Sequence, residues 1–199
     1  MRRTDRQGRR AGLLAAAVLA AAGTTEAMAE DIRFEVAHSL RPDQPFTVIY
    51  PDFMVRGATL SGSAFHLDYP GHPLQCEVLV RPDTEAGWTA EHALSSFDVA
   101  SAEAMWRETF PRFEARQKGL TSFQSGPAFL YWGETGENPS GVPLNIYRAE
   151  AVDAGRLYVV ECFVPTANAA ELLNLVTFLI RNFSTRPDAE CCIDPRGAE

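Results

Sequence analysis

Apolar and polar residues alternate along the first third of the chain, and this period of two predicts β-strands. Ile32–Val36 alternates strictly, and Phe46–Tyr50 resumes as a short strand after a proline-containing break. Thr59–Leu67 and Leu74–Val80 flank the turn Tyr69–His72. The Pro-Gly centre of that turn suits a type II turn, because Pro presets its φ angle and Gly accepts a positive φ. The two flanking segments therefore predict a β-hairpin.

The period changes further along the chain. From Leu94 to Phe113, apolar residues recur at steps of three and four, which predicts a helix with one buried face. Ser101, followed closely by an acidic residue, is a favourable helix start. Pro111 has no amide proton to donate, so we expect the helix to bend or stop just before it. The segment Lys118-Gly119 is expected to close this region.

Four further strands are predicted in the second half, over Leu120–Ser125, Ala128–Trp132, Val142–Ala151 and Leu157–Val164. The last of them is almost wholly apolar, so we place it at the centre of the sheet. Asp153–Arg156 predicts a tight hairpin connection. A final helix, capped by Thr166 or Asn168, carries an apolar stripe from Leu172 to Phe183. The order strands, helix, four strands, helix predicts an α+β fold, an antiparallel sheet with helices packed on it.

Three segments of the second half carry a resemblance to a known family. They are Ser125–Ala128, the hairpin Arg148–Pro165 and the end of the last helix, Leu179–Phe183. Over roughly Phe46–Phe183 the chain resembles the Mog1/PsbP-like domain, which PsbP-type photosystem proteins, the Mog1 nuclear-import factor and bacterial DcrB-like lipoproteins share. The resemblance implies a small α+β domain that binds or assembles rather than catalyses, and it transfers no catalytic residue. The cysteines and the cysteine-bearing tail depart from the family pattern.

The N-terminus has the arrangement of a secretory signal peptide. Residues 1–29 begin with five arginines, continue with the apolar run Ala11–Ala22 and end in the A-x-A sequence Ala27–Ala29. The apolar run is too short to span a bilayer as a helix. The pair Arg9-Arg10 lacks the flanking residues of a twin-arginine signal, so general export is the favoured route. We predict a leader at residues 1–29, one α+β domain at 30–184, an irregular tail at 185–199, and a periplasmic or secreted protein.

The charge of the chain disfavours whole classes of partner. The formal net charge is −8, and loss of the leader would leave 13 basic and 24 acidic residues, a net charge of −11. So acidic a surface repels phosphate backbones and anionic lipid, which argues against nucleic-acid binding and membrane adsorption. Beyond the leader, no apolar run reaches membrane-spanning length. Soluble behaviour is the simplest interpretation of this charge.

Four cysteines lie beyond the leader: Cys76, Cys162, Cys191 and Cys192. An even number in an exported protein favours disulfides over metal or thiol chemistry, and the C-x-x-C spacing of zinc sites is absent. A bond between the adjacent Cys191 and Cys192 would strain the backbone. Two arrangements remain open, and both join the tail to Cys76 and Cys162.

Motifs for catalysis or cofactors are not found in the sequence. His66, Asp68 and His72 flank one turn and suggest a metal site, but exposed turn histidines are the simpler interpretation, and no H-x-x-x-H or H-E-x-x-H spacing occurs. The sequence also lacks the G-x-S-x-G of serine hydrolases, the nucleotide-binding glycine motifs and the calcium-loop order. We therefore expect no metal and no cofactor, and a non-enzyme rather than an enzyme.

Aromatic residues give the better functional lead. Trp132 lies beside a Gly/Pro/Asn loop and Trp88 follows a glycine, so both are candidates for exposure, with Tyr131 next to the first. An exposed aromatic ring beside a loop suits recognition of a partner or an apolar ligand. The hypothesis is an exported, non-catalytic binding or assembly accessory of the cell envelope, whose partner is an envelope protein or a small apolar ligand. Two alternatives stay open: a small periplasmic hydrolase whose site forms only in three dimensions, and a purely structural envelope component.

Overall fold

Two antiparallel sheets and three α-helices make up the computed structural model, which describes residues 32–59, 62–83, 87–110, 112–136 and 141–192. The predicted leader, residues 1–29, lies outside the described residues, as does the end of the predicted tail. The strands are β1 (Phe34–His38), β2 (Thr47–Pro51), β3 (Val55–Arg56), β4 (Phe65–Asp68), β5 (Gln75–Pro82), β6 (Glu114–Phe123), β7 (Gly126–Glu134), β8 (Leu144–Asp153), β9 (Arg156–Pro165) and β10 (Phe183–Ser184). The helices are α1 (Ala90–Ser96), α2 (Val99–Arg107) and α3 (Ala169–Arg181), with a 3₁₀ turn at Thr166–Asn168.

The larger sheet has the order β3-β4-β5-β9-β8-β7-β6, and the smaller one has the order β1-β2-β10. β6 to β9 form a meander of hairpins, and β5 then pairs with β9. The turn between β8 and β9 has positive φ at both Ala154 and Gly155 (48° and 72°), the conformation that a two-residue hairpin prefers. The predicted hairpins at Asp153–Arg156 and around Tyr69–His72 are both confirmed.

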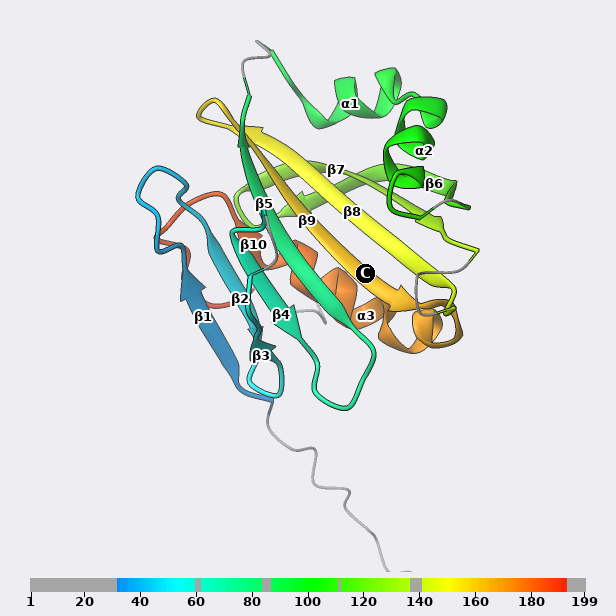
Figure 1. Ribbon diagram of the computed structural model, residues 1–199. Helices are drawn as coiled ribbons and strands as arrows, with labels where there is room; N and C mark the ends of the chain where they lie inside the picture. Colours follow the sequence, from blue (N-terminus) through cyan, green and yellow to red (C-terminus); the bar gives the residue numbers. More distant parts are fainter. Residues whose placement is uncertain (1–31, 60–61, 84–86, 111, 137–140, 193–199) are drawn as a thin grey trace, which may run out of the picture. The chain divides into compact units, whose positions relative to one another are not determined.

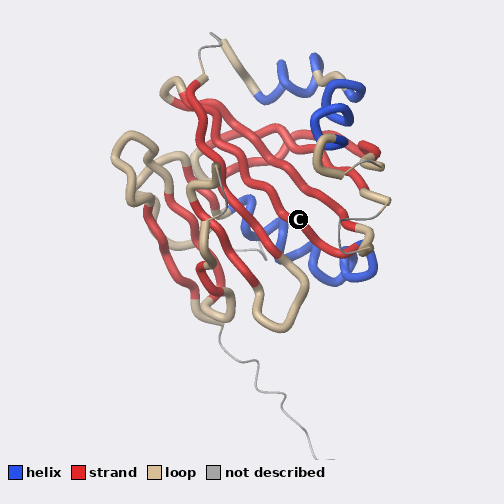
Figure 2. Tube along the Cα trace, viewed as in Figure 1, coloured by secondary structure: helices blue, strands red, loops and turns tan. Residues whose placement is uncertain are grey.

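Helices pack on both faces of the larger sheet, α3 on one and the pair α1 and α2 on the other (Figure 1; helices are blue in Figure 2). β9 therefore has both faces buried: Val160 and Val164 belong to the core on the α3 side, and Phe163 packs against the core beneath α1 and α2. This double burial explains the nearly continuous apolar run of that strand and confirms its central position. The predicted α+β architecture is correct.

The region around residues 90–120 differs from the prediction. Two short helices form in place of one, because each has its own N-cap. The Thr89 side chain accepts the backbone N–H of His92 and caps α1, and the Asp98 side chain accepts that of Ala100 and caps α2. The start predicted at Ser101 was therefore wrong. Residues 114–119, expected to complete the helical segment, form the first half of β6. The two-residue strands β3 and β10 were not predicted, because so short a segment carries no periodicity.

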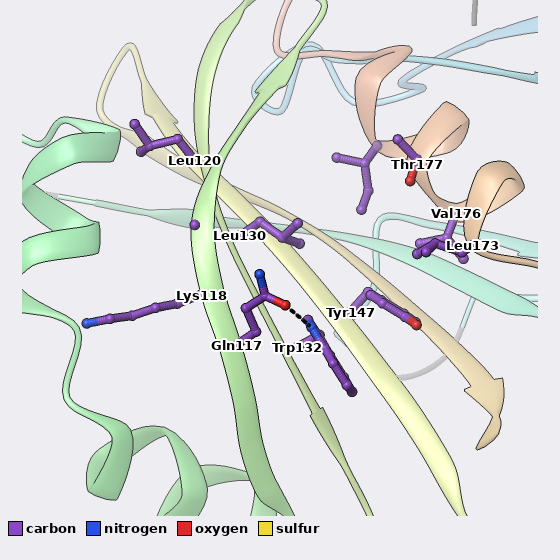
Figure 3. Close-up of a pocket in the computed structure, with 11 residues that line it drawn as sticks. Gln117, Lys118, Leu120, Leu130, Trp132, Tyr147, Leu173, Val176 and Thr177 are labelled. Atoms are coloured by element: carbon purple, nitrogen blue, oxygen red, sulfur yellow. Dashed lines mark hydrogen bonds between the residues drawn. The ribbon is translucent and has the colours of Figure 1, made fainter. Parts of the chain in front are cut away.

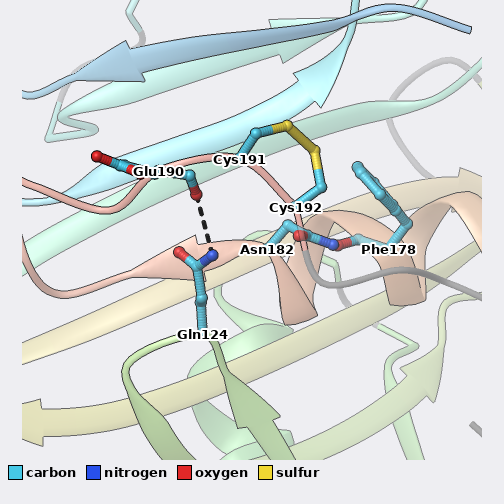
Figure 4. The surroundings of a disulfide bond; sticks show 6 residues. All are labelled: Gln124, Phe178, Asn182, Glu190, Cys191 and Cys192. Carbon is cyan, nitrogen blue, oxygen red and sulfur yellow. Dashed lines mark hydrogen bonds between the residues drawn. A yellow bond between two sulfur atoms is a disulfide. The ribbon is translucent and has the colours of Figure 1, made fainter. Parts of the chain in front are cut away.

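The disulfide pairing also differs from the prediction. Cys76 and Cys162 are direct partners in β5 and β9, with Cα atoms 4.1 Å apart, and they bond to each other. Cys191 and Cys192 form the second bond, which Figure 4 shows among residues at the end of α3. The expectation that the tail is joined to the sheet cysteines was wrong, because the register of two strands distant in sequence brings Cys76 and Cys162 together.

Hydrogen bonds, rather than a disulfide, connect the start of the tail to the sheet. The N–H of Thr185 donates to Ser125 Oγ at 3.0 Å, and its hydroxyl donates to Asp153 Oδ2 at 2.6 Å. Further along, Gln124 Nε2 donates to the carbonyl oxygen of Glu190 at 3.1 Å (Figure 4). The tail therefore contacts the β6–β7 turn at Thr185 and again at Glu190.

Candidate binding groove

A groove of about 360 Å³ lies between α3 and the end of the larger sheet formed by β6, β7 and β8. Its sheet side includes Leu130, Trp132 and Tyr147, and its helix side is formed by Leu173, Val176, Thr177 and Ile180. Figure 3 shows these two sets of side chains facing each other across the opening. A cavity of this size, lined mainly by apolar and aromatic side chains, is of the kind that accommodates a small ligand or an anchoring side chain.

Strand alternation brings Trp132 into the groove. Successive residues of a strand point to opposite faces, so Leu130 and Trp132 face α3 while Phe129 and Tyr131 face α1 and α2. The indole of Trp132 stacks on Tyr147, its register partner in β8, with ring centroids 5.9 Å apart. Its Nε1 donates a long hydrogen bond of 3.5 Å to Gln117 Oε1, on the other neighbouring strand (Figure 3).

The buried disulfide lies in the same row of cross-strand neighbours as this indole. The register pairs Cys76 with Cys162, Cys162 with Tyr147, and Tyr147 with Trp132. Cross-strand neighbours on one face are in side-chain contact range. The disulfide thus joins β5 to β9 directly beside the strand whose tyrosine supports the indole.

The groove contains no charged group on its inner surface among the described lining residues. Lys118 contributes to the lining, but Figure 3 shows its side chain pointing away from α3, and its Nζ donates to the carbonyl oxygen of Leu94 at 3.1 Å. Gln117, Thr177 and the Tyr147 hydroxyl are the polar groups. A neutral lining in a chain of net charge −8 favours an apolar occupant over an ionic one.

Of the three aromatic residues predicted as contacts, one lines the groove. Tyr131 is 4% exposed and accepts a hydrogen bond of 2.9 Å from Trp106 Nε1, under α2. Burial raises the pKa of Tyr131 to about 12, so its phenol stays neutral. Trp88 is half-buried and packs against both cores, away from the groove.

The helix side of the groove was missed in the sequence. Leu173 lies outside the apolar stripe of α3 and its side chain is 44% exposed. A leucine on the polar side of an otherwise amphipathic helix was the available signal, but single exposed leucines are common on protein surfaces and the signal is weak.

The histidines predicted to flank a turn do not assemble a site. His66 Nε2 bonds to Asp68 Oδ1 at 3.1 Å within the sheet, and His72 stacks on Tyr69 with ring centroids 4.0 Å apart. Asp68 and His72 do line an open cavity of about 230 Å³, but the described residues around it include no serine, threonine or cysteine. Within the described parts of the chain, no three His, Cys, Asp or Glu residues are grouped as a metal site requires.

A charged network crosses the opposite face of the sheet. Arg148 pairs with Glu161 and also donates to Glu150 Oε2 at 3.2 Å, beneath the α1 and α2 side. Burial raises the pKa of Glu161 despite the opposing charge of Arg148. Burial and the like charge of Glu161 raise the pKa of Glu77, the next residue in the row. The Arg148 guanidinium is thus shared between the carboxylates of Glu150 and Glu161, and we interpret this buried network as structural.

Comparisons with known proteins identify the fold. No protein-family model matches the sequence, and no curated protein matches it. Among solved structures, cyanobacterial PsbP (CyanoP) from Synechocystis sp. is 8% identical, with a TM-score of 0.54, over 75% of this chain and 91% of that one. LpqN of Mycobacterium tuberculosis, described as involved in cell envelope biogenesis, is 12% identical, with a TM-score of 0.51, over 77% and 91%. The Saccharomyces cerevisiae Ran-binding protein Mog1p is 12% identical, with a TM-score of 0.50, over 77% and 96%.

These likenesses are structural and carry no close sequence identity. They show that the chain has the Mog1/PsbP-like fold, as the sequence motifs led us to expect. Among the described residues, no helix has both the length and the apolarity needed to cross a membrane.

Proposed function

We propose that this chain, which has the Mog1/PsbP-like fold, is an exported, non-catalytic binding or assembly accessory of the cell envelope. The observation that carries the proposal is the neutral apolar groove between Trp132 and α3. An apolar groove with an aromatic wall is the usual form of a recognition site, and aromatic anchors contribute most of the binding energy of interfaces.

Other observations support the proposal. The solved structures that share the fold include LpqN, described as involved in cell envelope biogenesis, and Mog1p, described as a Ran-binding protein. The signal-peptide pattern of residues 1–29 and the cysteine content favour export. A purely structural component would not need a groove. A hydrolase would need a nucleophile beside His66 or His72; the cavity that His72 lines has no serine, threonine or cysteine among its described residues, and His66 Nε2 is bonded to Asp68.

Two exposed apolar residues on helices provide a matched test. Leu173 lies in the groove on α3, whereas Val99 lies on α2 outside the groove lining, and their side chains are 44% and 45% exposed. A photo-crosslinking residue is placed at one position or the other, and the variant is produced in the cells that naturally contain the protein. The crosslinked products then report which surface contacts another molecule. We expect a specific crosslinked product from position 173 and none from position 99.

The corresponding charge variants extend this test. Leu173→Glu should abolish capture of the crosslinked partner, because a carboxylate in an apolar contact carries a desolvation cost, while Val99→Glu should retain capture. Equal yields from both positions would contradict a binding role for the groove. Recovery of an uncut chain from the cytosol, rather than a chain beginning at Glu30 in the periplasm or medium, would contradict export.

A further inference from the structure

The larger sheet ends at β6, a ten-residue strand with no neighbour on its outer side among the described strands. An edge strand presents backbone N–H and C=O groups that another strand can bind. The other end of the sheet, β3, has only two residues. β6 is therefore the long edge of this fold, and Gln117 and Gly119 on it also line the groove.

The register with β7 determines which backbone groups of β6 point outward. Phe123 and Gly126 are the pair next to the two-residue turn of the β6–β7 hairpin, and such a pair exchanges two backbone hydrogen bonds. The same holds for every second pair further from the turn, which are Thr121 with Ala128 and Gly119 with Leu130. The residues between them, Lys118, Leu120 and Ser122, direct their N–H and C=O groups away from β7. Pro127, which lies opposite Ser122 and has no N–H, fits a position outside the ladder bonds.

The outward groups at both ends of β6 already have partners. At the start, a bulge after Ala115 keeps the alternation, and the outward Ala115 N–H donates to Glu103 Oε1 at 3.1 Å. At the other end, the N–H of Gln124 donates to the carbonyl oxygen of Phe183 at 2.7 Å. Phe183 is in the extended segment β10, so this chain itself places an extended backbone against the end of that edge.

Between these two ends, no described residue bonds to the backbone N–H of Lys118, Leu120 or Ser122. Two features that usually block an edge, a bulge and an ion-paired arginine, lie at Arg116 and precede this stretch. A third, a lysine, lies within it at Lys118, but its Nζ is turned to the carbonyl oxygen of Leu94. Leu120 is 50% exposed, and the space beside Gly119 is open, because a Cβ built there would meet no atom within 4 Å.

We propose that the partner binds as an extended, uncharged and largely apolar peptide segment, which adds a strand to β6 at Lys118–Ser122 and inserts a side chain into the groove. This inference rests on the proposed function and specifies how the partner binds. Alternate side chains of an added strand point to the α3 face, where Gly119 leaves room beside Leu130 and Trp132. The neutral lining selects an apolar side chain, and the backbone bonds require an extended conformation.

The probe for the test is a ten-residue peptide selected on the purified full-length protein from a displayed random library. A series of single N-methylated versions of this peptide removes one amide proton at a time. We expect every second version to bind about tenfold or more weakly, since about 1.4 kcal/mol corresponds to a factor of ten, and the versions between them to bind nearly as well as the parent. A loss without this period of two, or failure to select any groove-binding peptide, overturns the proposal.

Amide hydrogen exchange provides a second readout that needs no variant. Bound peptide should slow exchange at Lys118, Leu120 and Ser122 by about tenfold or more, while Gly119 and Thr121, already bonded to β7, change little. Unchanged exchange at the three outward amides overturns strand addition even if the peptide binds.

A pair of variants separates this inference from the proposed function. Leu120→Pro removes one outward N–H without removing a ladder bond, and Leu120→Ala trims the same side chain while it keeps the N–H. We expect Leu120→Pro to weaken envelope crosslinking from position 173 much more than Leu120→Ala, which trims a groove-lining side chain but keeps the N–H. If Leu120→Pro reduces crosslinking from position 173 no more than Leu120→Ala does, while Leu173→Glu abolishes capture of the partner, strand addition is refuted and the groove function stands. If Leu173→Glu and Leu120→Pro both leave capture of the partner unaffected, both proposals are refuted.

Discussion

The two disulfides should contribute very differently to stability, because they close loops of very different length. The bond between Cys76 and Cys162 spans 86 residues, and the bond between Cys191 and Cys192 spans one. In the chain-entropy treatment, a loop of that longer length removes about 15 cal/mol/K from the unfolded state, which is about 4.6 kcal/mol at 25 °C. A bond between adjacent residues restricts the unfolded chain hardly at all.

The measurement uses a variant that isolates the buried bond. Cys191→Ser/Cys192→Ser leaves only the bond between Cys76 and Cys162, so its oxidised and reduced forms differ in that bond alone and keep the same core volume. With a urea m-value of about 2 kcal/mol/M, reduction should lower the unfolding midpoint by about 2 M. The double serine variant should itself unfold within about 0.5 M of the parent protein.

The size of this effect bears on where the protein is stable. A domain of this length is stabilised by roughly 5–15 kcal/mol, so loss of about 4.6 kcal/mol brings it close to unfolding in a reducing compartment. A change of less than about 1 kcal/mol on reduction would refute the loop-closure reasoning. A cost above about 2 kcal/mol for Cys191→Ser/Cys192→Ser would show that the tail bond acts through folded-state contacts instead.

Three further changes test other parts of the structure. Gly133→Ala should destabilise the protein by about 1–3 kcal/mol in urea unfolding, because a Cβ there would lie 2.6 Å from a backbone oxygen. Gly119→Ala is the control and should cost little, because the space around it is open. Equal costs of the two variants would contradict the packing. Arg148→Met should lower the free energy of unfolding by about 3–5 kcal/mol, because it leaves Glu161 buried without its partner. In a double-mutant cycle, Arg148→Met/Glu161→Leu should recover most of that loss. Additive losses would argue against direct pairing. The raised pKa of Glu77 means that the folded state holds this proton more tightly than the unfolded state, so its ionisation destabilises the fold as pH rises through the raised pKa. Glu77→Gln should therefore stabilise the protein at pH 7, by less than about 1 kcal/mol for a half-exposed group, and lose this advantage below about pH 4; the same gain at both pH values would contradict the electrostatic cause.

Much of the fold was predictable from local pattern. The alternation around Leu74–Val80, the continuous apolar run Leu157–Val164 and the apolar stripe of α3 identified elements that the structure contains, because burial on one face or on both leaves a direct trace in sequence. The interval 90–120 was harder. Leu94 and Phe97 continue a helical spacing across two helices, and only the cap at Asp98 marks the break.

The candidate site was predictable only in part. The aromatic cluster at Tyr131-Trp132 was recognisable, but alternation sends these neighbours to opposite faces, and which face is open depends on where α1, α2 and α3 pack. The helix half of the groove depends on Leu173, which has no distinguishing sequence context. The open edge at Lys118–Ser122 depends on the register of β6 with β7.

The sequence by itself determined the α+β class, the hairpins at Tyr69–His72 and Asp153–Arg156, the central apolar strand and the final helix, because these follow from short-range periodicity and turn chemistry. The tertiary structure decided which cysteines pair, that Trp132 and not Tyr131 reaches the groove, and which strand ends the sheet. The physical reason is the same in each case: strand register and layer packing are set by contacts between residues distant in the chain, such as Cys76 with Cys162, and local pattern carries no record of them.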